Sequence, residues 1–265
     1  FISVPTYTTN TERDHQHIIE DSGASAIIVS NAKQGQVVMP AAIRATNAHH
    51  LIGMEPLRSG QDTGVQIHEW VNMVNRTDAD VEACAAFAAT LTRDETACII
   101  YTSGTGGAPR GVQQHHGAIL LNVEGCVDII SNDFGWGDEV FLSFLPTSHA
   151  YEHTGGQFLP IGLGGQIFYA ESLEKLAGNI EDVRPTIMVV VPRLFEVLRT
   201  KILKGLEKQG KLANALLRRA LALGSKDMAG KLHFWDKPMN LFIDKTLRPK
   251  VQAKFGGLDV RVNNA

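Results

Sequence analysis

The sequence has few cysteines and no long apolar run, and both shortages limit what the protein can be. Three cysteines, Cys84, Cys98 and Cys126, occur in 265 residues. An odd number at wide spacing forms neither a disulfide framework nor a CxxC metal motif, so we expect a protein of the reducing cytoplasm. No apolar run reaches the roughly 18 residues of a transmembrane helix, and no basic start with an apolar core marks a signal peptide.

The chain also lacks an overall excess of basic residues. Its 25 lysines and arginines face 28 acidic residues, which gives a net charge of -3 and a pI near 6.4. This balance predicts no nucleic-acid partner. Residues 193–254 differ from the rest of the chain. They contain fifteen basic and five acidic residues, so their net charge is +10 and that of the remaining residues is -13. We interpret them as leucine-faced helices with a solvated basic side; the alternative is peripheral contact with an anionic membrane or with coenzyme A phosphates.

Apolar segments of strand length alternate with helical patterns, which predicts an α/β fold with a mostly parallel sheet and helices on both faces. Strands are predicted at residues 1–5, 26–30, 97–101, 139–145, 166–169, 186–191 and 258–262. Helices are predicted at residues 11–23, 40–48, 80–89, 117–130, 151–163, 173–180, 192–206 and 212–223, with a polar turn at 59–62. The first strand, helix and strand form a β-α-β unit.

A glycine-rich segment, Tyr101 to Gly111, follows a predicted buried strand. It reads Tyr-Thr-Ser-Gly-Thr-Gly-Gly-Ala-Pro-Arg-Gly, and its glycines expose backbone amides while hydroxyls and one guanidinium add donors. The candidate phosphate-binding residues are Thr102, Ser103, Gly104, Thr105, Gly106, Gly107 and Arg110. The spacing matches neither a Walker loop nor GxGxxG. A flexible linker is the alternative, which the preceding strand disfavours.

The segment resembles the phosphate loop of the adenylate-forming enzymes, Tyr-Thr-Ser-Gly-Thr-Thr-Gly-x-Pro-Lys-Gly. It departs from that pattern twice: Gly106 replaces a threonine, and Arg110 replaces a lysine. The first change removes a hydroxyl donor. The second keeps the charge but exchanges a compact ammonium for a planar fork.

Three further segments extend the resemblance. Phe144 to Thr154 resembles the Leu-Pro-Leu-Ser-His-Ala-Tyr-Glu segment of long-chain fatty acid CoA ligases. Val190 to Glu196 and Ser3 to Tyr7 resemble two other segments of that subgroup. The resemblance therefore covers nearly all of the chain, although thinly between residues 31 and 95.

The resemblance implies that ATP and a long-chain fatty acid give an acyl-adenylate and pyrophosphate, and that coenzyme A then takes the acyl group. It implies catalytic roles for Arg110, on the phosphates, and for His149, facing the adenylate and the acyl carboxylate. It also implies that Thr105 helps to hold Mg²⁺. The alternatives are another carboxylate, a carrier-protein acceptor or, from a different class, a non-catalytic nucleotide-binding or interaction module.

His149 and His153, with Glu152 between them, also suggest a zinc site. The order differs from His-Glu-x-x-His, however, and the sequence offers no evident third ligand. We therefore interpret His153 as a helix-start residue bonded to the backbone.

Several motifs of the family are missing after residue 192: the adenine-pocket Tyr-Gly-x-Thr-Glu, the ribose-binding aspartate, the hinge and the C-terminal catalytic lysine. We therefore expect an incomplete N-terminal domain that is inactive alone. Residues 1–95 would form its β-α-β portion and residues 96–265 its phosphate-loop portion, without the small C-terminal domain.

Overall fold

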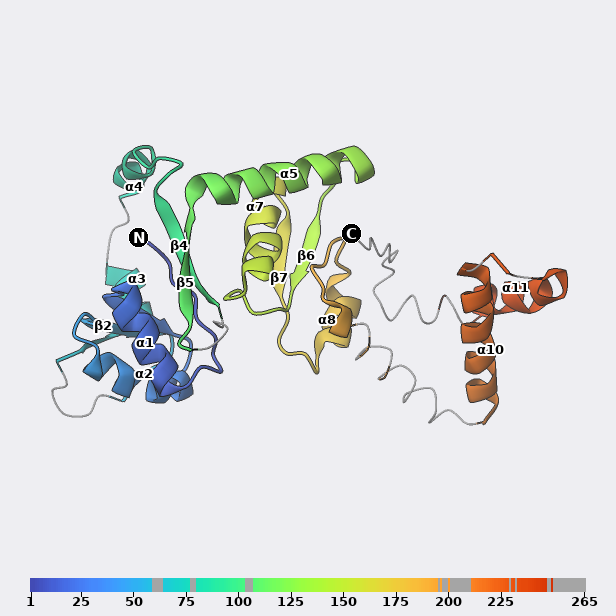
Figure 1. Ribbon diagram of the computed structural model, residues 1–265, viewed down its shortest axis with the longest axis horizontal. Coiled ribbons are helices and arrows are strands. Elements are labelled where there is room, and N and C mark those ends of the chain that lie inside the picture. Colours follow the sequence, from blue (N-terminus) through green and yellow to red (C-terminus); the bar gives the residue numbers. More distant parts are fainter. Residues whose placement is uncertain are drawn as a thin grey trace. The chain divides into compact units, whose positions relative to one another are not determined.

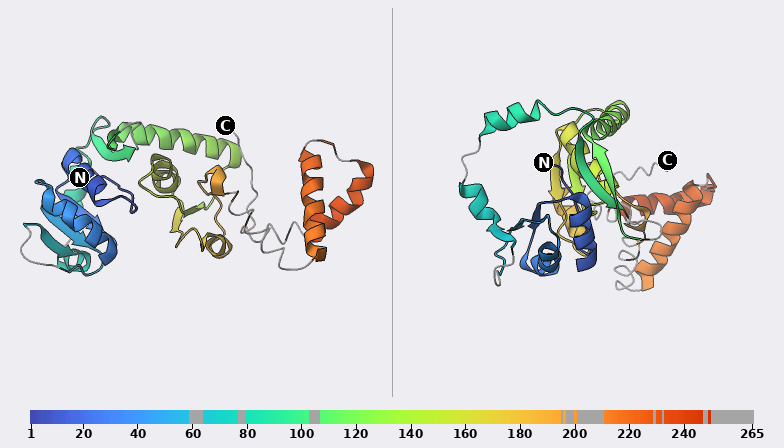
Figure 2. Two further views of the ribbon diagram at one scale, coloured as in Figure 1. Left: turned by 60° about the horizontal axis from the view of Figure 1, so that its bottom comes forward. Right: turned by 60° about the vertical axis from the view of Figure 1, so that its left-hand side comes forward.

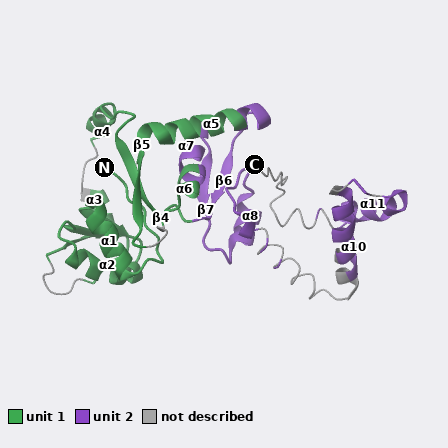
Figure 3. Cartoon of the chain, viewed as in Figure 1, with its two compact units in different colours: residues 1–129, 146–154 green, residues 130–145, 155–265 purple. Residues whose placement is uncertain are grey.

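A computed structural model describes residues 1–58, 64–76, 80–102, 107–194, 196, 200, 211–228, 230–231, 233–246 and 249. Within them, helices accompany three small sheets (Figures 1 and 2). The predicted α/β class is confirmed. The chain divides into two compact units (Figure 3): residues 1–129 with 146–154, and residues 130–145 with 155–265. The expected portions 1–95 and 96–265 stay a prediction.

Helix α1 (Glu12–Ser22) confirms the helix predicted at residues 11–23. The Thr11 hydroxyl accepts a hydrogen bond from the Asp14 amide, and the Asp14 carboxylate accepts one from the Thr11 amide. This reciprocal capping satisfies two amides that the first helical turn leaves without partners. Gly23, with φ of 69°, ends the helix in the left-handed conformation that glycine adopts readily.

Helix α2 (Ala32–Arg44) begins eight residues before the predicted start at Pro40. Asn31 caps it, because its side chain accepts a hydrogen bond of 2.9 Å from the Gln34 amide. The predicted range of 40–48 is therefore wrong at its start, because the helix begins before Pro40 and continues through it. The cap at Asn31 was the overlooked signal.

The first sheet of unit 1 is parallel, in the order β1–β2–β3. Its strands are β1 (Ala26–Val29), β2 (His50–Gly53) and β3 (Gln66–Glu69). Helices α1 and α2 pack against each other and share one core with this sheet. The buried members of that core are Ile19, Val29, Val38, Ala41, Ala42, Ala45, Ala48, Leu51 and Val65. Strands β2 and β3 were not predicted, because their sequences, His50-Leu51-Ile52-Gly53 and Gln66-Ile67-His68-Glu69, contain few apolar residues.

The second sheet of unit 1 is antiparallel and is the exception among the described strand pairings, which are mostly parallel as predicted. Strands β4 (Thr96–Thr102) and β5 (Arg110–His115) form an antiparallel hairpin. Strand β5 was not predicted, because its residues are mostly exposed and lack apolar alternation. The predicted strand at residues 1–5 is reduced to one bridge between Ser3 and Cys98. The helices of this part are α3 (Trp70–Arg76), α4 (Val81–Ala88), α5 (His116–Phe134), which runs into unit 2, and α6 (Ala150–Glu152).

Unit 2 holds the parallel pair β6 (Val140–Ser143) and β7 (Gln166–Tyr169). Its other elements are η1 (His153–Phe158), which begins in unit 1, α7 (Leu159–Leu163), α8 (Leu176–Val183), α10 (Lys211–Met228), η2 (Phe234–Asp236) and α11 (Lys237–Thr246). A small core gathers Leu142, Leu176, Ile180 and Leu194. None of the described helices combines the length and the apolar character needed to cross a bilayer.

Two predictions for this part need correction. The helix expected at residues 151–163 consists of α6, the π-helical η1 and α7; Pro160, which has no amide hydrogen, interrupts the α-helical pattern. The strand expected at residues 186–191 is a single bridge between Phe141 and Ile187. Helix α11 was not predicted. The turn at 59–62, the strand at 258–262 and most of the helix at 192–206 lie outside the described residues.

Candidate functional site

The glycine-rich segment joins the two strands of the β4–β5 hairpin. Thr102 and Arg110 are the last paired residues of the ladder, one on each strand. Both are exposed, and directly opposed residues of an antiparallel pair project to the same face. The structure therefore brings two of the predicted phosphate contacts together. Gly107 is exposed beyond them, whereas Ser103, Gly104, Thr105 and Gly106 lie outside the described residues.

Strand β4 anchors this hairpin in the interior. Cys98, Ile100 and Tyr101 are 1%, 2% and 6% exposed. Burial raises the pKa of the Cys98 thiol, which therefore stays protonated and serves packing rather than nucleophilic chemistry.

Helix α1 contacts both stems of the glycine-rich segment. The Tyr101 hydroxyl donates a hydrogen bond of 2.6 Å to Asp21 Oδ2, and His17 Nε2 donates one of 2.8 Å to the carbonyl of Pro109. The rings of His17 and Tyr101 meet edge to face at 6.3 Å. Burial, together with the bond to Asp21, raises the pKa of Tyr101, so the phenol keeps the proton that it donates.

Sequence reasoning missed His17 and Asp21. They stand 92 and 80 residues from their partners, and nothing in their neighbourhood in the sequence marks them. The one available signal was the spacing of four between His17 and Asp21, which places both residues on one face of α1.

His149 caps helix α6 and is exposed. Its Nδ1 accepts a hydrogen bond of 3.2 Å from the Tyr151 amide. The neutral ring therefore carries its hydrogen on Nε2, which can donate to an oxygen of a bound molecule.

His153 has the backbone bond that we expected of it. It is 8% exposed, and its Nδ1 donates to the carbonyl of Thr147 at 2.9 Å. In the part of the chain that the structure describes, no three His, Cys, Asp or Glu side chains converge as metal ligands.

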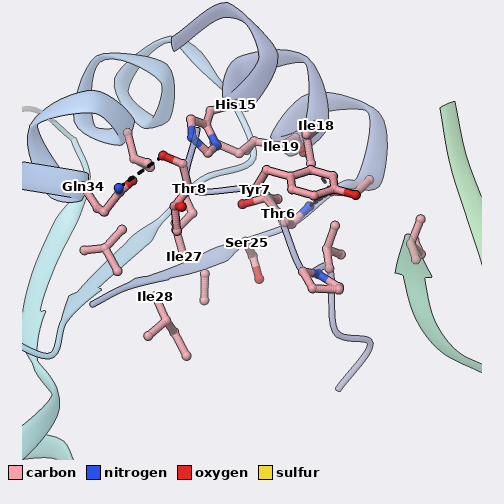
Figure 4. A pocket seen from close by; sticks show the side chains of 18 of the residues that line it. Thr6, Tyr7, Thr8, His15, Ile18, Ile19, Ser25, Ile27, Ile28 and Gln34 are labelled. Atoms are coloured by element: carbon pink, nitrogen blue, oxygen red, sulfur yellow. Dashed lines mark hydrogen bonds between the residues drawn. The ribbon is translucent and has the colours of Figure 1, made fainter. Parts of the chain in front are cut away.

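A cavity of about 680 Å³ lies in unit 1 beneath α1, between this helix, β1 and the N-terminal segment (Figure 4). Isoleucines line much of it, Gln34 Nε2 donates to the carbonyl of Thr8 at 3.2 Å, and Thr147 also borders it. His15 is 5% exposed there, and burial lowers its pKa, so the imidazole is neutral. No lysine or arginine is among the described lining residues, and a phosphate would find no side-chain countercharge here.

Two solved structures show the fold that this chain shares with known proteins. The adenylation domain of a carboxylate reductase from Mycobacterium chelonae has a TM-score of 0.60 and 18% identity, over 87% of this chain and 38% of that one. A benzoate CoA ligase from Burkholderia xenovorans has a TM-score of 0.55 and 22% identity, over 73% of this chain and 35% of that one. These likenesses establish the fold, which this chain shares with a part of each of those two proteins.

The family follows from the sequence. The model of the AMP-binding enzyme family matches residues 1–243, and the chain belongs to that family. Long chain acyl-CoA synthetase 1 of Arabidopsis thaliana is 27% identical over 97% of this chain and 39% of its own length. The mouse long-chain-fatty-acid–CoA ligase ACSBG2 is 26% identical over 96% of this chain and 39% of its own length. The chain thus spans about two fifths of the length of these relatives.

Proposed function

We propose that the full-length protein activates a long-chain fatty acid with ATP and transfers the acyl group to coenzyme A. The observation that carries this proposal is the glycine-rich segment, which rises from a buried strand with Thr102 and Arg110 opposed at its base. Family membership over residues 1–243 supports the adenylation step. The names of the relatives, long-chain synthetases and ligases, support the choice of acid.

The reaction needs little covalent chemistry from the protein. A carboxylate oxygen attacks the α-phosphorus of ATP and pyrophosphate leaves; the thiol of coenzyme A then attacks the acyl carbonyl and loses its proton, and AMP leaves. Catalysis therefore depends on donors that stabilise charge on the phosphates. We assign this task to the hydroxyls and amides of Thr102, Ser103, Gly104, Thr105, Gly106 and Gly107 and to the guanidinium of Arg110.

His149 is proposed to act on the acyl side. Because its Nδ1 is occupied by the Tyr151 amide, Nε2 is the donor available to the carboxylate or to the adenylate. The backbone bond fixes the orientation of the ring, which favours a positioned donor over a freely rotating one.

Mg²⁺ is proposed as the metal, with the Thr105 hydroxyl as one oxygen ligand. Mg²⁺ takes oxygen ligands and usually keeps several waters and substrate phosphate oxygens. A site with few protein ligands agrees with the described residues, among which no three ligands converge. When bound, the ion would neutralise charge on the phosphates.

The acceptor, the location and the activity of this chain alone are finer parts of the proposal. We choose coenzyme A over a carrier protein because of the relatives' names. The cysteine content supports a cytoplasmic location, and the basic stretch at residues 193–254 supports peripheral contact with anionic membranes. The missing adenine, ribose and hinge motifs support inactivity of the chain by itself.

Product analysis tests the proposal. The full-length protein is incubated with ATP and Mg²⁺, with and without palmitate, and then with coenzyme A. We expect AMP and pyrophosphate only with the acid, and palmitoyl-CoA after the thiol is added. Formation of ADP and orthophosphate would contradict adenylation. ATP binding without turnover would favour the non-catalytic module, and a preference for benzoate or a short acid would overturn the long-chain assignment.

A further inference from the structure

We propose that helix α1 is a clamp that positions the phosphate-binding segment through His17 and Asp21. The inference rests on the proposed function only in what the segment binds; the contacts themselves are structural. Tyr101 is the first residue of the glycine-rich segment, and Pro109 stands near its end. Helix α1 reaches the first through Asp21 and the second through His17.

The two clamp residues are built to act together. His17 and Asp21 are four positions apart, so they lie on one face of α1, which packs beside β5. The Tyr101–Asp21 bond, at 2.6 Å, is in the range of a hydroxyl donating to a carboxylate, which is among the stronger hydrogen bonds of proteins. The Pro109 carbonyl can only accept, so His17 Nε2 carries the hydrogen.

Gly111 gives the clamp the space that it needs. A Cβ atom at this position would lie 2.9 Å from Tyr101 Cζ and 2.9 Å from Ile99 Cγ2. The Tyr101 ring therefore lies directly against the backbone of its ladder partner, Gly111. This contact accounts physically for the last glycine of the motif: it leaves room for the ring whose hydroxyl reaches α1.

The consequence is preorganisation. With one stem held at Tyr101 and the other at Pro109, the ends of the segment keep their separation before ATP arrives. Thr102 and Arg110, next to the two held positions, are then placed before ATP binds, and donors placed in advance lose less conformational freedom on binding. His17 and Asp21 are thus positioning residues, since each acts through a residue of the hairpin.

Kinetics of the full-length protein test the clamp against a purely structural role. For Asp21→Ala and Tyr101→Phe we expect the KM for ATP to rise about 10-fold, the size of one lost hydrogen bond to a charged group, with the KM for palmitate unchanged. Asp21→Asn keeps an oxygen acceptor and should restore most of the affinity. A general loss of folded protein would instead lower the apparent kcat and leave both KM values alone.

Glu20→Gln is the matched control. Glu20 neighbours Asp21 on α1, is exposed, and bonds Gln16 instead of the hairpin. Glu20→Gln removes one negative charge, as Asp21→Asn does, and we expect it to leave kcat and both KM values unchanged. The KM for ATP of the double variant, Asp21→Ala with Tyr101→Phe, should be no higher than that of either single variant. Each of these three proteins lacks the same hydrogen bond, between Tyr101 and Asp21. Additive losses would contradict the clamp.

Hydrogen exchange separates the failure of the clamp from the failure of the proposed function. Peptides covering residues 99–115 should exchange faster in Asp21→Ala and Tyr101→Phe than in Glu20→Gln, whether or not the protein makes acyl-CoA. If the wild type shows no acid-dependent AMP formation, the proposed function fails, and exchange still decides the clamp. Equal exchange rates in all variants would overturn it.

Discussion

The β4–β5 hairpin of unit 1 and the α10–α11 pair of unit 2 are fixed in different ways. Hydrogen bonds across 80 and 92 residues hold the hairpin to α1. The helical pair is held by ion pairs of the Asp236 carboxylate with Arg219, at 3.2 Å, and with Lys226, at 3.1 Å. These partners are only 17 and 10 residues away in the sequence. Long-range contacts thus position the segment that carries the proposed chemistry, while near-neighbour contacts hold the basic helices.

The two kinds of contact differ in what they stabilise. Asp236 has an almost fully buried carboxylate that two cations satisfy, which is a structural arrangement. The Tyr101 hydroxyl donates a hydrogen bond to Asp21, an exposed residue of α1 that is far away in the sequence. Tyr101 also begins the glycine-rich segment, which is rich in hydrogen-bond donors. The contacts of Asp236 stabilise a local fold, whereas the contact of Tyr101 joins α1 to the hairpin of the proposed site.

The largest expected effect is at the tip of the hairpin. In the full-length protein Arg110→Ala should lower the rate of adenylation by about 10²-fold, the order found when one donor to developing charge is lost. Arg110→Lys should recover much of that rate, because the charge remains. Pyrophosphate release measures both. An alanine variant with the wild-type rate would show that the guanidinium has no part in adenylation.

The next effect is on the close contact in the hairpin. Gly111→Ala should lower the free energy of unfolding by about 1–3 kcal/mol, because the new methyl group overpacks against Tyr101 and Ile99. Gly107→Ala is the control, since nothing lies within 4 Å of its added Cβ. Urea unfolding measures the pair. Equal stability of the two variants would show that the ring can move aside at little cost.

The sequence predicted the parts of the hairpin that are local. The run Cys98 to Tyr101 is mostly apolar, with Cys98, Ile100 and Tyr101 buried, and the glycines, hydroxyls and Arg110 stand in one short segment. Strand β5 escaped prediction because it pairs with a buried partner while remaining exposed itself. The pairing of β5 depends on its contact with β4, and the sequence of β5 has no apolar alternation that would predict it.

Helices were predictable where their caps were recognised. Thr11 was predicted as the cap of α1 and is one, whereas the caps of α4 and α2, Asp80 and Asn31, were not used in their prediction. The clamp could not be predicted, because the pairing of Asp21 with Tyr101 exists only after α1 has packed beside the hairpin. Tertiary contacts of this kind leave no mark in a single sequence.

A smaller effect is expected from acid. Since burial lowers the pKa of His15 below the ordinary value near 6.5, the unfolded chain binds more protons as the pH falls, and stability is lost from about pH 6.5 downward. His15→Gln should flatten this dependence, while His49→Gln, at an exposed histidine, should leave it unchanged. Thermal melts between pH 7.5 and 5.5 measure the slopes. Parallel slopes for all three proteins would contradict the role of His15.

The smallest effect concerns the helical pair. The hydrogen bond from Lys226, with the charges of Lys226 and Arg219, lowers the pKa of Asp236, so its contribution is present above the ordinary value near 3.9 and is lost as the pH falls through the lowered one. Asp236→Asn should lower helicity at neutral pH, and the exposed Asp227→Asn should not. Circular dichroism compares them. Equal helicity would show that the ion pairs do not hold α10 to α11.

The exchange of labelled pyrophosphate into ATP tests most directly whether the glycine-rich segment serves adenylation. It is measured on the full-length protein with palmitate and Mg²⁺ and without coenzyme A, so that only the first half-reaction runs. We expect exchange that requires the acid, weakens in Asp21→Ala and nearly disappears in Arg110→Ala. Absence of exchange in the wild type, or exchange that is independent of palmitate, would contradict adenylation of a fatty acid at this segment.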